Sequence, residues 1–339
     1  MSILVTGGAG YIGSHTVVAL LDAGHDVVVI DNLCNSSSLS LARVERITGK
    51  KVTFLKGDIR DTYFVQDALE RYGVDAVIHF AALKAVGESM HKPLQYFHNN
   101  INGSLNLLEA MKSAGVFQLV YSSSATVYGD PGTPVFRESM QTGRVTNNYG
   151  YTKLIIEQMI ERMVAADARW KVAVLRYFNP VGAHKSGLIG EAPAGVPNNL
   201  VPYIAQVATG QRERVSIYGN DYDTPDGTCL RDYIHVVDLA KGHMCALNKL
   251  ASIQGVKVWN LGSGHPSSVL EVIHAFEQAS RKSVPYVFEP RREGDLACFW
   301  ADPSKAAEEL GWTARHSLSD MMVDAWHWQC NNPNGFDAE

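Results

Sequence analysis

The sequence has few cysteines, and it lacks both a long basic run and a long apolar run. The five cysteines are scattered among 339 residues and never form a Cys-x-x-Cys pair, which argues against a disulfide framework and against a zinc site. A formal net charge of -5 without a basic cluster argues against a nucleic-acid-binding surface. No apolar run approaches the length of a membrane span, and the first residues read as a strand instead of a targeting peptide. We therefore expect a soluble cytoplasmic protein without a metal site, which binds neither nucleic acid nor a membrane.

Apolar segments of two lengths alternate along the first half of the chain. Short runs, typical of buried strands, lie at 3–6, 26–30, 52–55, 76–80, 119–122 and 172–177, and helical patterns lie at 11–23, 62–72 and 149–164. Strands that alternate with helices form a parallel sheet, so we predict an α/β fold with a Rossmann-type doubly wound sheet. A Gly- and Pro-bearing stretch at 182–195 marks a change of lobe. The prediction is a Rossmann domain over 1–181 and a smaller mixed α/β lobe over 182–339, with a loose tail from Asn331.

Three glycines stand between the first predicted strand and the first predicted helix. Gly7, Gly10 and Gly13 have the spacing Gly-x-x-Gly-x-x-Gly, which permits a tight turn, close approach to a pyrophosphate and close packing of the helix on the sheet. The start of the helix adds free amide donors and the positive end of its dipole. Asp31 ends the second predicted strand, where a carboxylate accepts hydrogen bonds from ribose hydroxyls and repels a 2′-phosphate. The pattern predicts a dinucleotide site that prefers NAD to NADP.

Tyr149 and Lys153 form a Tyr-x-x-x-Lys pair at the start of a predicted helix, and a spacing of four residues places both side chains on one face. A tyrosine titrates near pH ~10 in water, so it needs a nearby positive charge before it can act as a base near neutrality. Lys153 and an oxidised nicotinamide would supply that charge. The run SSSATVYG at 122–129 follows a strand, where open sheets place ligand-binding loops. Tyr151 is not a second candidate, because the residue four positions later is Ile155.

The glycine turn, the SSSATVYG run, the Tyr149–Lys153 pair, RYFNP at 176–180 and RREGD at 291–295 occur together in this chain. In this combination the sequence resembles the extended short-chain dehydrogenase/reductases, and within them the UDP-galactose 4-epimerases, from Leu4 to about Trp328. The resemblance implies an isomerase that inverts C4 of UDP-glucose and UDP-galactose by reversible hydride transfer to tightly bound NAD, through a 4-keto intermediate. It also implies a homodimer in galactose metabolism, with NAD bound by 1–181 and the UDP-sugar by 182–339.

The resemblance further implies a role for individual residues. Tyr149 would be the base, Lys153 would hold the nicotinamide ribose and lower the tyrosine pKa, and Ser124 would orient the sugar hydroxyl. The implied cofactor contacts are Gly7, Gly10, Tyr11, Ile12, Gly13, Asp31, Asn32, Asn35, Ser36, Asp58, Ile59, Phe80, Ala81, Ala82, Lys84, Asn99, Ser122, Tyr149, Lys153, Tyr177 and Phe178. The implied substrate contacts are Ser124, Tyr149, Asn179, Asn199, Leu200, Ser216, Tyr218, Arg231, Tyr233, Arg292, Asp295 and Phe299. The two arginines suit a diphosphate because a guanidinium donates hydrogen bonds in bidentate form.

Two other functions use the same motifs. A nucleotide-sugar 4,6-dehydratase begins with the same oxidation but needs a further acid and base, and related dehydratases carry acidic residues where this chain has Ala125 and Thr126. A non-enzymatic NAD-binding regulator of the same fold would commonly lack the tyrosine or the lysine, and this chain has both. Both alternatives are therefore disfavoured.

Phe299 carries an expectation about selectivity. The resemblance places residue 299 against the sugar, and a phenylalanine ring would fill the space that a C2 acetamido group needs. We expect a strong preference for UDP-galactose and UDP-glucose over N-acetylated UDP-sugars. The alternative is that Phe299 packs inward beside Trp300 and does not touch the substrate.

Overall fold

The computed structural model describes residues 1–193, 195–292 and 294–336. A seven-stranded sheet forms the centre of the larger lobe, with strand order β11-β7-β5-β4-β1-β2-β3 and every neighbouring pair parallel. Its strands are β1 (Ser2–Thr6), β2 (Asp26–Asp31), β3 (Thr53–Lys56), β4 (Ala76–His79), β5 (Gln118–Ser124), β7 (Lys171–Tyr177) and β11 (Gly255–Leu261). The chain order therefore reverses between β1 and β4, and ligands of doubly wound sheets bind beyond the strand ends at such a point.

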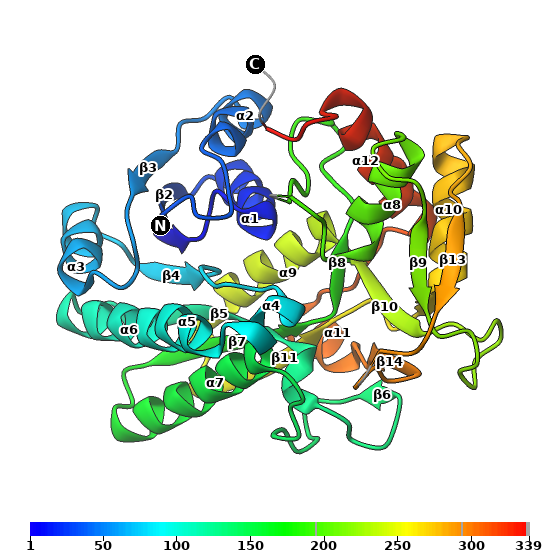
Figure 1. Ribbon diagram of the computed structural model, residues 1–339. Helices are drawn as coiled ribbons and strands as arrows, with labels where there is room; N and C mark the ends of the chain where they lie inside the picture. The colour runs from blue at the N-terminus through cyan, green and yellow to red at the C-terminus, as the bar shows by residue number, and fades with distance from the viewer. Residues whose placement is uncertain (194, 293, 337–339) are drawn as a thin grey trace.

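Helices cover both faces of this sheet, as Figure 1 shows. They are α1 (Tyr11–Asp22), α2 (Leu39–Thr48), α3 (Thr62–Arg71), α4 (Val86–His91), α5 (Pro93–Tyr96), α6 (Gly103–Ser113), α7 (Asn148–Ala166) and α9 (Val236–Lys249), and a π-helical turn (Phe97–Asn102) joins α5 to α6. Successive strand residues point to opposite faces, so Ile3 and Val5 pack in one core while Leu4 packs in the other. The near-continuous apolar runs of these strands follow from burial on both faces.

The smaller lobe, at the right of Figure 1, is built from short strands and three longer helices. It contains β8 (Asn179–Val181), α8 (Leu200–Ala208), β9 (Val215–Tyr218), β10 (Leu230–His235), β12 (Pro266–Ser268), α10 (Val269–Ser280), β13 (Tyr286–Glu289), β14 (Cys298–Ala301) and α12 (Leu318–Asn331). Helix α11 (Ser304–Leu310) packs instead on β11 and α9 of the larger lobe. Strand β6 (Val135–Phe136) crosses from the first half of the chain to pair with β14. Helices α8, α10 and α12 enclose a separate apolar core.

The predicted division at 181/182 falls at the end of β8, and it stays a prediction. The large sheet nevertheless takes its outer strand β11 from the second part of the chain, and α9 from that part packs against α1. The lobes are thus interleaved in sequence, because the chain returns to complete the first sheet after β10.

The prediction of a loose tail is wrong for the residues that the structure describes after α12. Asn332 and Phe336 are buried, and the Phe336 ring lies 5.0 Å from that of Trp328. Arg43 of α2 donates to Asn332 Oδ1 over 2.5 Å and lies 5.1 Å from the Phe336 ring centroid. A cation held against aromatic faces fixes this segment to the larger lobe. The expected tail residues 337–339 lie outside the described residues.

Three histidines are buried in the larger lobe. Burial lowers the pKa of His15 and His79 to about 3 and that of His243 to about 4. The two His79 ring nitrogens contact the hydroxyls of Thr6, over 2.7 Å, and Ser104, over 2.9 Å. The described residues contain no cluster of three or more metal-ligating acidic, His or Cys side chains, and none of their helices could cross a membrane.

We predict that acid destabilises the fold through these histidines. Each is neutral in the folded state down to pH 4 or below, whereas the unfolded chain protonates near pH ~6.5, so stability present above that pH is lost as the pH falls. Between pH 7.5 and pH 5 each buried histidine should cost about 2 kcal/mol of unfolding free energy. His79→Asn should remove about that amount of the pH dependence measured by urea unfolding. The exposed control His265→Asn should not, and an unchanged slope in His79→Asn would contradict the assignment.

Candidate active site

The turn between β1 and α1 has no room for side chains at two of its glycines. Gly7 has φ +71°, and a Cβ there would lie 2.7 Å from the backbone nitrogen of Ala81. A Cβ on Gly13 would lie 2.3 Å from the Gly7 carbonyl oxygen. Gly10 is the N-cap residue of α1, so the first amides of that helix face outward without a capping side chain. This is the arrangement that binds a pyrophosphate.

Asp31 joins this turn to the loop that follows β2. Its buried carboxylate accepts hydrogen bonds from the backbone of Ala9 (3.1 Å) and Leu33 (2.9 Å) and from Ser36 Oγ (2.8 Å). The acid is therefore fixed beside the glycine turn. This is the position that recognition of an adenosine ribose requires.

A second acid lies next to the same loop. Asp58 accepts from Asn32 Nδ2 over 2.9 Å and pairs with Arg60 over 2.7 Å. The hydrogen bonds from Arg60 hold the pKa of Asp58 well below its usual range, so this carboxylate is ionised at any physiological pH. The sequence reasoning did not identify Arg60, although an arginine two residues after an acid in a loop was a visible signal.

The loop after β4 is cross-linked to the π-helical turn and to α7 by one amide. Buried Asn100 accepts from Leu83 N over 2.8 Å, donates to Leu83 O over 3.0 Å and donates to Thr152 Oγ1 over 3.0 Å. Asn99 donates to the Asn100 side chain. The predicted contact Phe80 packs 4.7 Å from the His243 ring, so this side chain also contributes to the core.

The predicted catalytic residues meet where β5 ends and α7 begins. Ser124 is the last residue of β5, and its Oγ accepts from Thr126 Oγ1 over 3.0 Å. Half-buried Tyr149 and buried Lys153 lie one helical turn apart, with Lys153 Nζ 5.9 Å from the Tyr149 ring centroid. The ammonium donates to the Ser122 carbonyl over 2.6 Å. Asn147 caps this helix by accepting from Gly150 N, which fixes the turn that carries Tyr149.

Burial shifts the pKa of both Tyr149 and Lys153. Burial raises the pKa of Tyr149 to about 12, against a lowering by the Ser124 hydroxyl, and burial lowers the pKa of Lys153 to about 7. The chain alone therefore does not lower the tyrosine pKa, because desolvation outweighs the hydrogen bond with Ser124. A Tyr149 base requires further positive charge.

A buried ion pair supports Lys153 from one turn further along α7. Glu157 accepts from Arg176 Nη2 over 2.5 Å and from Arg176 Nε over 3.0 Å, and it also accepts from Ser123 Oγ. The charge of Glu157 raises the pKa of Lys153 against the effect of burial. Sequence reasoning missed Glu157, although it stands four residues after Lys153 on the same helical face.

Five predicted substrate residues gather in the smaller lobe. Asp295 pairs with Arg292 over 2.9 Å and with Arg231 over 3.8 Å. The Arg292 guanidinium carbon lies 4.7 Å from the Tyr218 ring centroid, and that of Arg231 lies 4.6 Å from the Phe299 ring centroid. Two guanidinium groups share one carboxylate beside two aromatic rings, which is a donor set suited to a nucleoside diphosphate.

The other predicted substrate residues lie in different settings. Asn179 pairs with Tyr233 across β8 and β10, and Tyr233 is buried in the core of the smaller lobe. Ser216 lies two residues before Tyr218 on β9, so both side chains point to one face. Asn199 and Leu200 begin α8.

The comparisons with known proteins agree over the whole chain. Residues 3–262 match the model of the NAD dependent epimerase/dehydratase family. A UDP-glucose 4-epimerase of Neisseria meningitidis serogroup C is 56% identical over 335 residues, 99% of each chain, and that of Bacillus subtilis strain 168 is 55% identical over 336 residues, 99% of each chain. The crystal structure of UDP-glucose 4-epimerase from Bifidobacterium longum in complex with NAD+ and UDP is 52% identical, with a TM-score of 0.96 over 99% of this chain and 100% of the other.

The chain belongs to the NAD dependent epimerase/dehydratase family. The predicted fold and the predicted cofactor, NAD, are thereby confirmed. The residues of the glycine turn fit that cofactor, because the start of α1 has no side-chain cap, the turn is too tight for side chains at Gly7 and Gly13, and Ala9 N holds the Asp31 carboxylate beside it.

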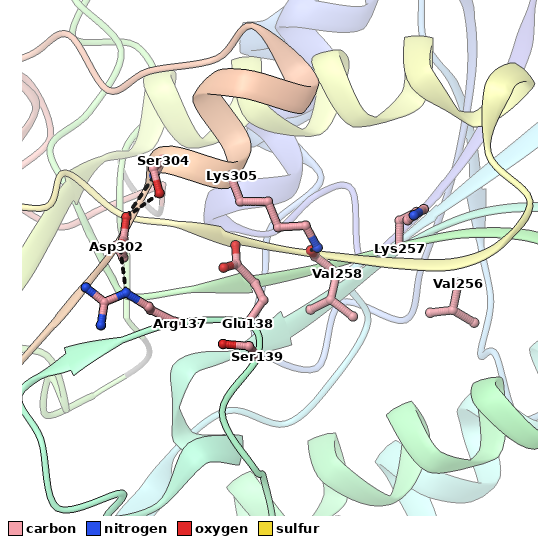
Figure 2. A pocket seen from close by; sticks show the side chains of 9 residues that line it. All are labelled: Arg137, Glu138, Ser139, Val256, Lys257, Val258, Asp302, Ser304 and Lys305. Carbon is pink, nitrogen blue, oxygen red and sulfur yellow. Dashed lines mark hydrogen bonds and ion pairs between the residues drawn. The ribbon is translucent and has the colours of Figure 1, made fainter.

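A pocket outside these residues lies along the edge strand β11 of this epimerase-family fold. It has a volume of about 470 Å³, and Figure 2 shows Arg137, Asp302 and Ser304 at one end of it. Arg137 pairs with Asp302 over 2.8 Å. Lys305 Nζ donates to the Val258 carbonyl over 2.8 Å, and Glu138 accepts from Asn260 N over 2.7 Å. Charged side chains thus bind two backbone groups of the edge strand. None of the predicted site residues lines this pocket.

Proposed function

We propose that the chain is a UDP-glucose 4-epimerase that interconverts UDP-glucose and UDP-galactose with tightly bound NAD. One observation carries the proposal: Tyr149, Lys153 and Ser124 converge at the carboxyl end of β5, in a chain 56% identical to a UDP-glucose 4-epimerase over 99% of both lengths. The guanidinium pair of Arg231 and Arg292 adds the donors for a UDP-sugar.

In the proposed mechanism, Tyr149 takes the proton from the sugar O4 and later returns it, and Ser124 orients the reacting hydroxyl. Bound NAD supplies the reversible acceptor of the hydride from C4. Lys153 would hold the nicotinamide ribose, and the charges of the lysine and the bound cofactor together would offset the burial that raises the Tyr149 pKa.

Inversion requires that the 4-keto sugar stay bound while it turns. Arg231 and Arg292 hold the diphosphate, and Asp295 already fixes both guanidinium groups. An anchored nucleotide keeps the ketone at the site without holding the sugar ring, so the ring can present its other face and recover the proton and hydride. The reaction has no net redox change.

Other parts of the proposal rest on the family resemblance. They are the division into an NAD-binding domain over 1–181 and a UDP-sugar-binding domain over 182–339, a homodimer, a cytoplasmic location and a role in galactose metabolism. The proposed cofactor and substrate contacts are those of the sequence prediction, and the geometry of the glycine turn, of the Tyr149–Lys153 pair and of the Arg292–Asp295 pair supports them.

The first test is the activity of the purified protein. It should convert UDP-galactose to UDP-glucose without added cofactor, and denaturation should release NAD or NADH, because an epimerase returns the same hydride and gains nothing by releasing its cofactor. Chromatography of the sugars and spectrophotometry of the released nucleotide measure both. A cofactor-free preparation that is fully active without NAD would falsify the proposal, and a dehydrated 4-keto product would indicate the dehydratase.

The second prediction concerns the proton acceptor. Tyr149→Phe removes the phenol with little change in volume, so turnover should fall about 10²- to 10⁴-fold while UDP binding persists. The matched control is Tyr151→Phe, two residues along the same helix and exposed, which should be mild. Near wild-type turnover in Tyr149→Phe would remove the tyrosine from the mechanism.

The third prediction concerns sugar selectivity. The Phe299 ring lies 5.5 Å from that of Phe136 and 6.0 Å from that of Phe178, and the Arg231 guanidinium covers it. The ring is only half-buried, so it can both pack and limit the sugar site. Wild type should strongly prefer UDP-galactose to UDP-N-acetylgalactosamine, and Phe299→Gly should gain part of the second activity. Equal wild-type rates on both sugars would end the steric argument, and the variant's UDP-galactose rate controls for misfolding.

A further inference from the structure

Glu191 lies in the segment between β8 and α8, and it is not among the residues predicted for the site. Its side chain is only 11% exposed. One oxygen, Oε1, accepts a hydrogen bond from Lys84 Nζ over 3.0 Å and another from Asn199 Nδ2 over 2.6 Å. A single carboxylate oxygen therefore joins a residue proposed for the cofactor to a residue proposed for the substrate.

The three side chains come from separate parts of the fold. Lys84 belongs to the loop after β4 in the larger lobe, whereas Asn199 is the N-cap residue of α8 in the smaller lobe. Lys84 Nζ also lies 5.9 Å from the ring centroid of Tyr11, the first residue of α1. The contact thus spans the two lobes next to the helix end where the pyrophosphate is proposed to bind.

The backbone of Glu191 is held from a third direction. Its carbonyl accepts from Trp328 Nε1 over 3.1 Å. Gly190 lies so close to the same indole that a Cβ there would be 2.4 Å from its ring. Because α12 fixes the backbone, the carboxylate has a defined place from which to hold the two donors.

The Asn199 side chain binds Glu191 instead of capping its own helix. Asparagine is among the best N-cap residues because its side chain accepts from a helix amide. Asn199 makes no such bond to α8 and donates instead to Glu191. The first amides of α8 therefore remain free of a side-chain cap.

We propose that Glu191 is a positioning residue that couples the two lobes by holding Lys84 and Asn199 for cofactor and UDP-sugar. This inference rests on the proposed function for the identity of the two ligands. A carboxylate near two diphosphates would also repel them, but Lys84 at 3.0 Å neutralises it. Hydrogen bonds to an ionised group are roughly twice as strong as neutral ones, so the ordering of the donors outweighs the residual repulsion.

The experiment is Glu191→Gln in the NAD-loaded protein, with UDP as the calorimetric probe. Glutamine keeps the size but loses the charge, so UDP binding should weaken about tenfold, the low end of what losing a hydrogen bond to a charged group costs. KM for UDP-galactose should rise by a similar factor while kcat changes little, since Tyr149 and Lys153 are untouched. The control Glu70→Gln removes an exposed carboxylate on α3 that accepts only from the same helix, and it should change neither value.

A double-mutant cycle tests the coupling itself. Lys84→Met and Asn199→Ala should be non-additive for UDP affinity in the wild-type background, because both donate to the same carboxylate oxygen, and additive in the Glu191→Ala background, which has no acceptor there. Tighter UDP binding in Glu191→Gln would show that the acid opposes the diphosphate and would overturn the proposal. A lower melting temperature with unchanged UDP affinity would also overturn it. A wild type that binds no UDP would instead refute the proposed function.

Discussion

The close approach of the β1–α1 turn to the loop after β4 is the constraint on which the rest of the site depends. A Cβ on Gly7 or Gly13 would collide with backbone atoms, so only glycine lets α1 start so near the sheet. That position aims the open helix amides at the point where the strand order reverses. Asp31 then accepts from Ala9 within the turn, so the acid proposed for the ribose and the amides proposed for the pyrophosphate are held together.

Burial governs the electrostatics of Tyr149 and Lys153. Tyr149 and Lys153 are both driven toward their neutral forms, and the Glu157–Arg176 pair behind them is enclosed by the same packing. Within the chain, Glu157 opposes the loss of the lysine charge. A site of this kind is activated by the arrival of a cationic ligand, because the protein alone leaves its base protonated. In the proposed mechanism, retention of the cofactor and activity of the tyrosine are therefore linked.

Local patterns predicted much of this molecule from the sequence. The first strands and helices, the glycine turn, Asp31 and the one-turn spacing of Tyr149 and Lys153 depend on neighbours in the chain, and the described elements agree with them. The sequence prediction placed the segment of β11 in the second lobe because of its position in the chain. In the structure the chain returns to the large sheet, where β11 pairs with β7, and no local sequence pattern indicates this long-range pairing. Glu191 meets Lys84 across 107 positions, and Phe336 meets Arg43 across a longer separation. The effect of burial on the Tyr149 pKa could not be predicted from the sequence, because desolvation depends on packing that the sequence does not display.

The capped edge of β11 has a consequence for the behaviour of the protein in concentrated solution. An edge strand offers unpaired amides and carbonyls on which another chain can add a strand. Here Lys305 holds the Val258 carbonyl and Glu138 holds the Asn260 amide, so an incoming strand would have to displace two charged groups and leave them without partners. Two backbone groups of β11 are therefore already occupied by charged side chains, which opposes the addition of a further strand at this edge.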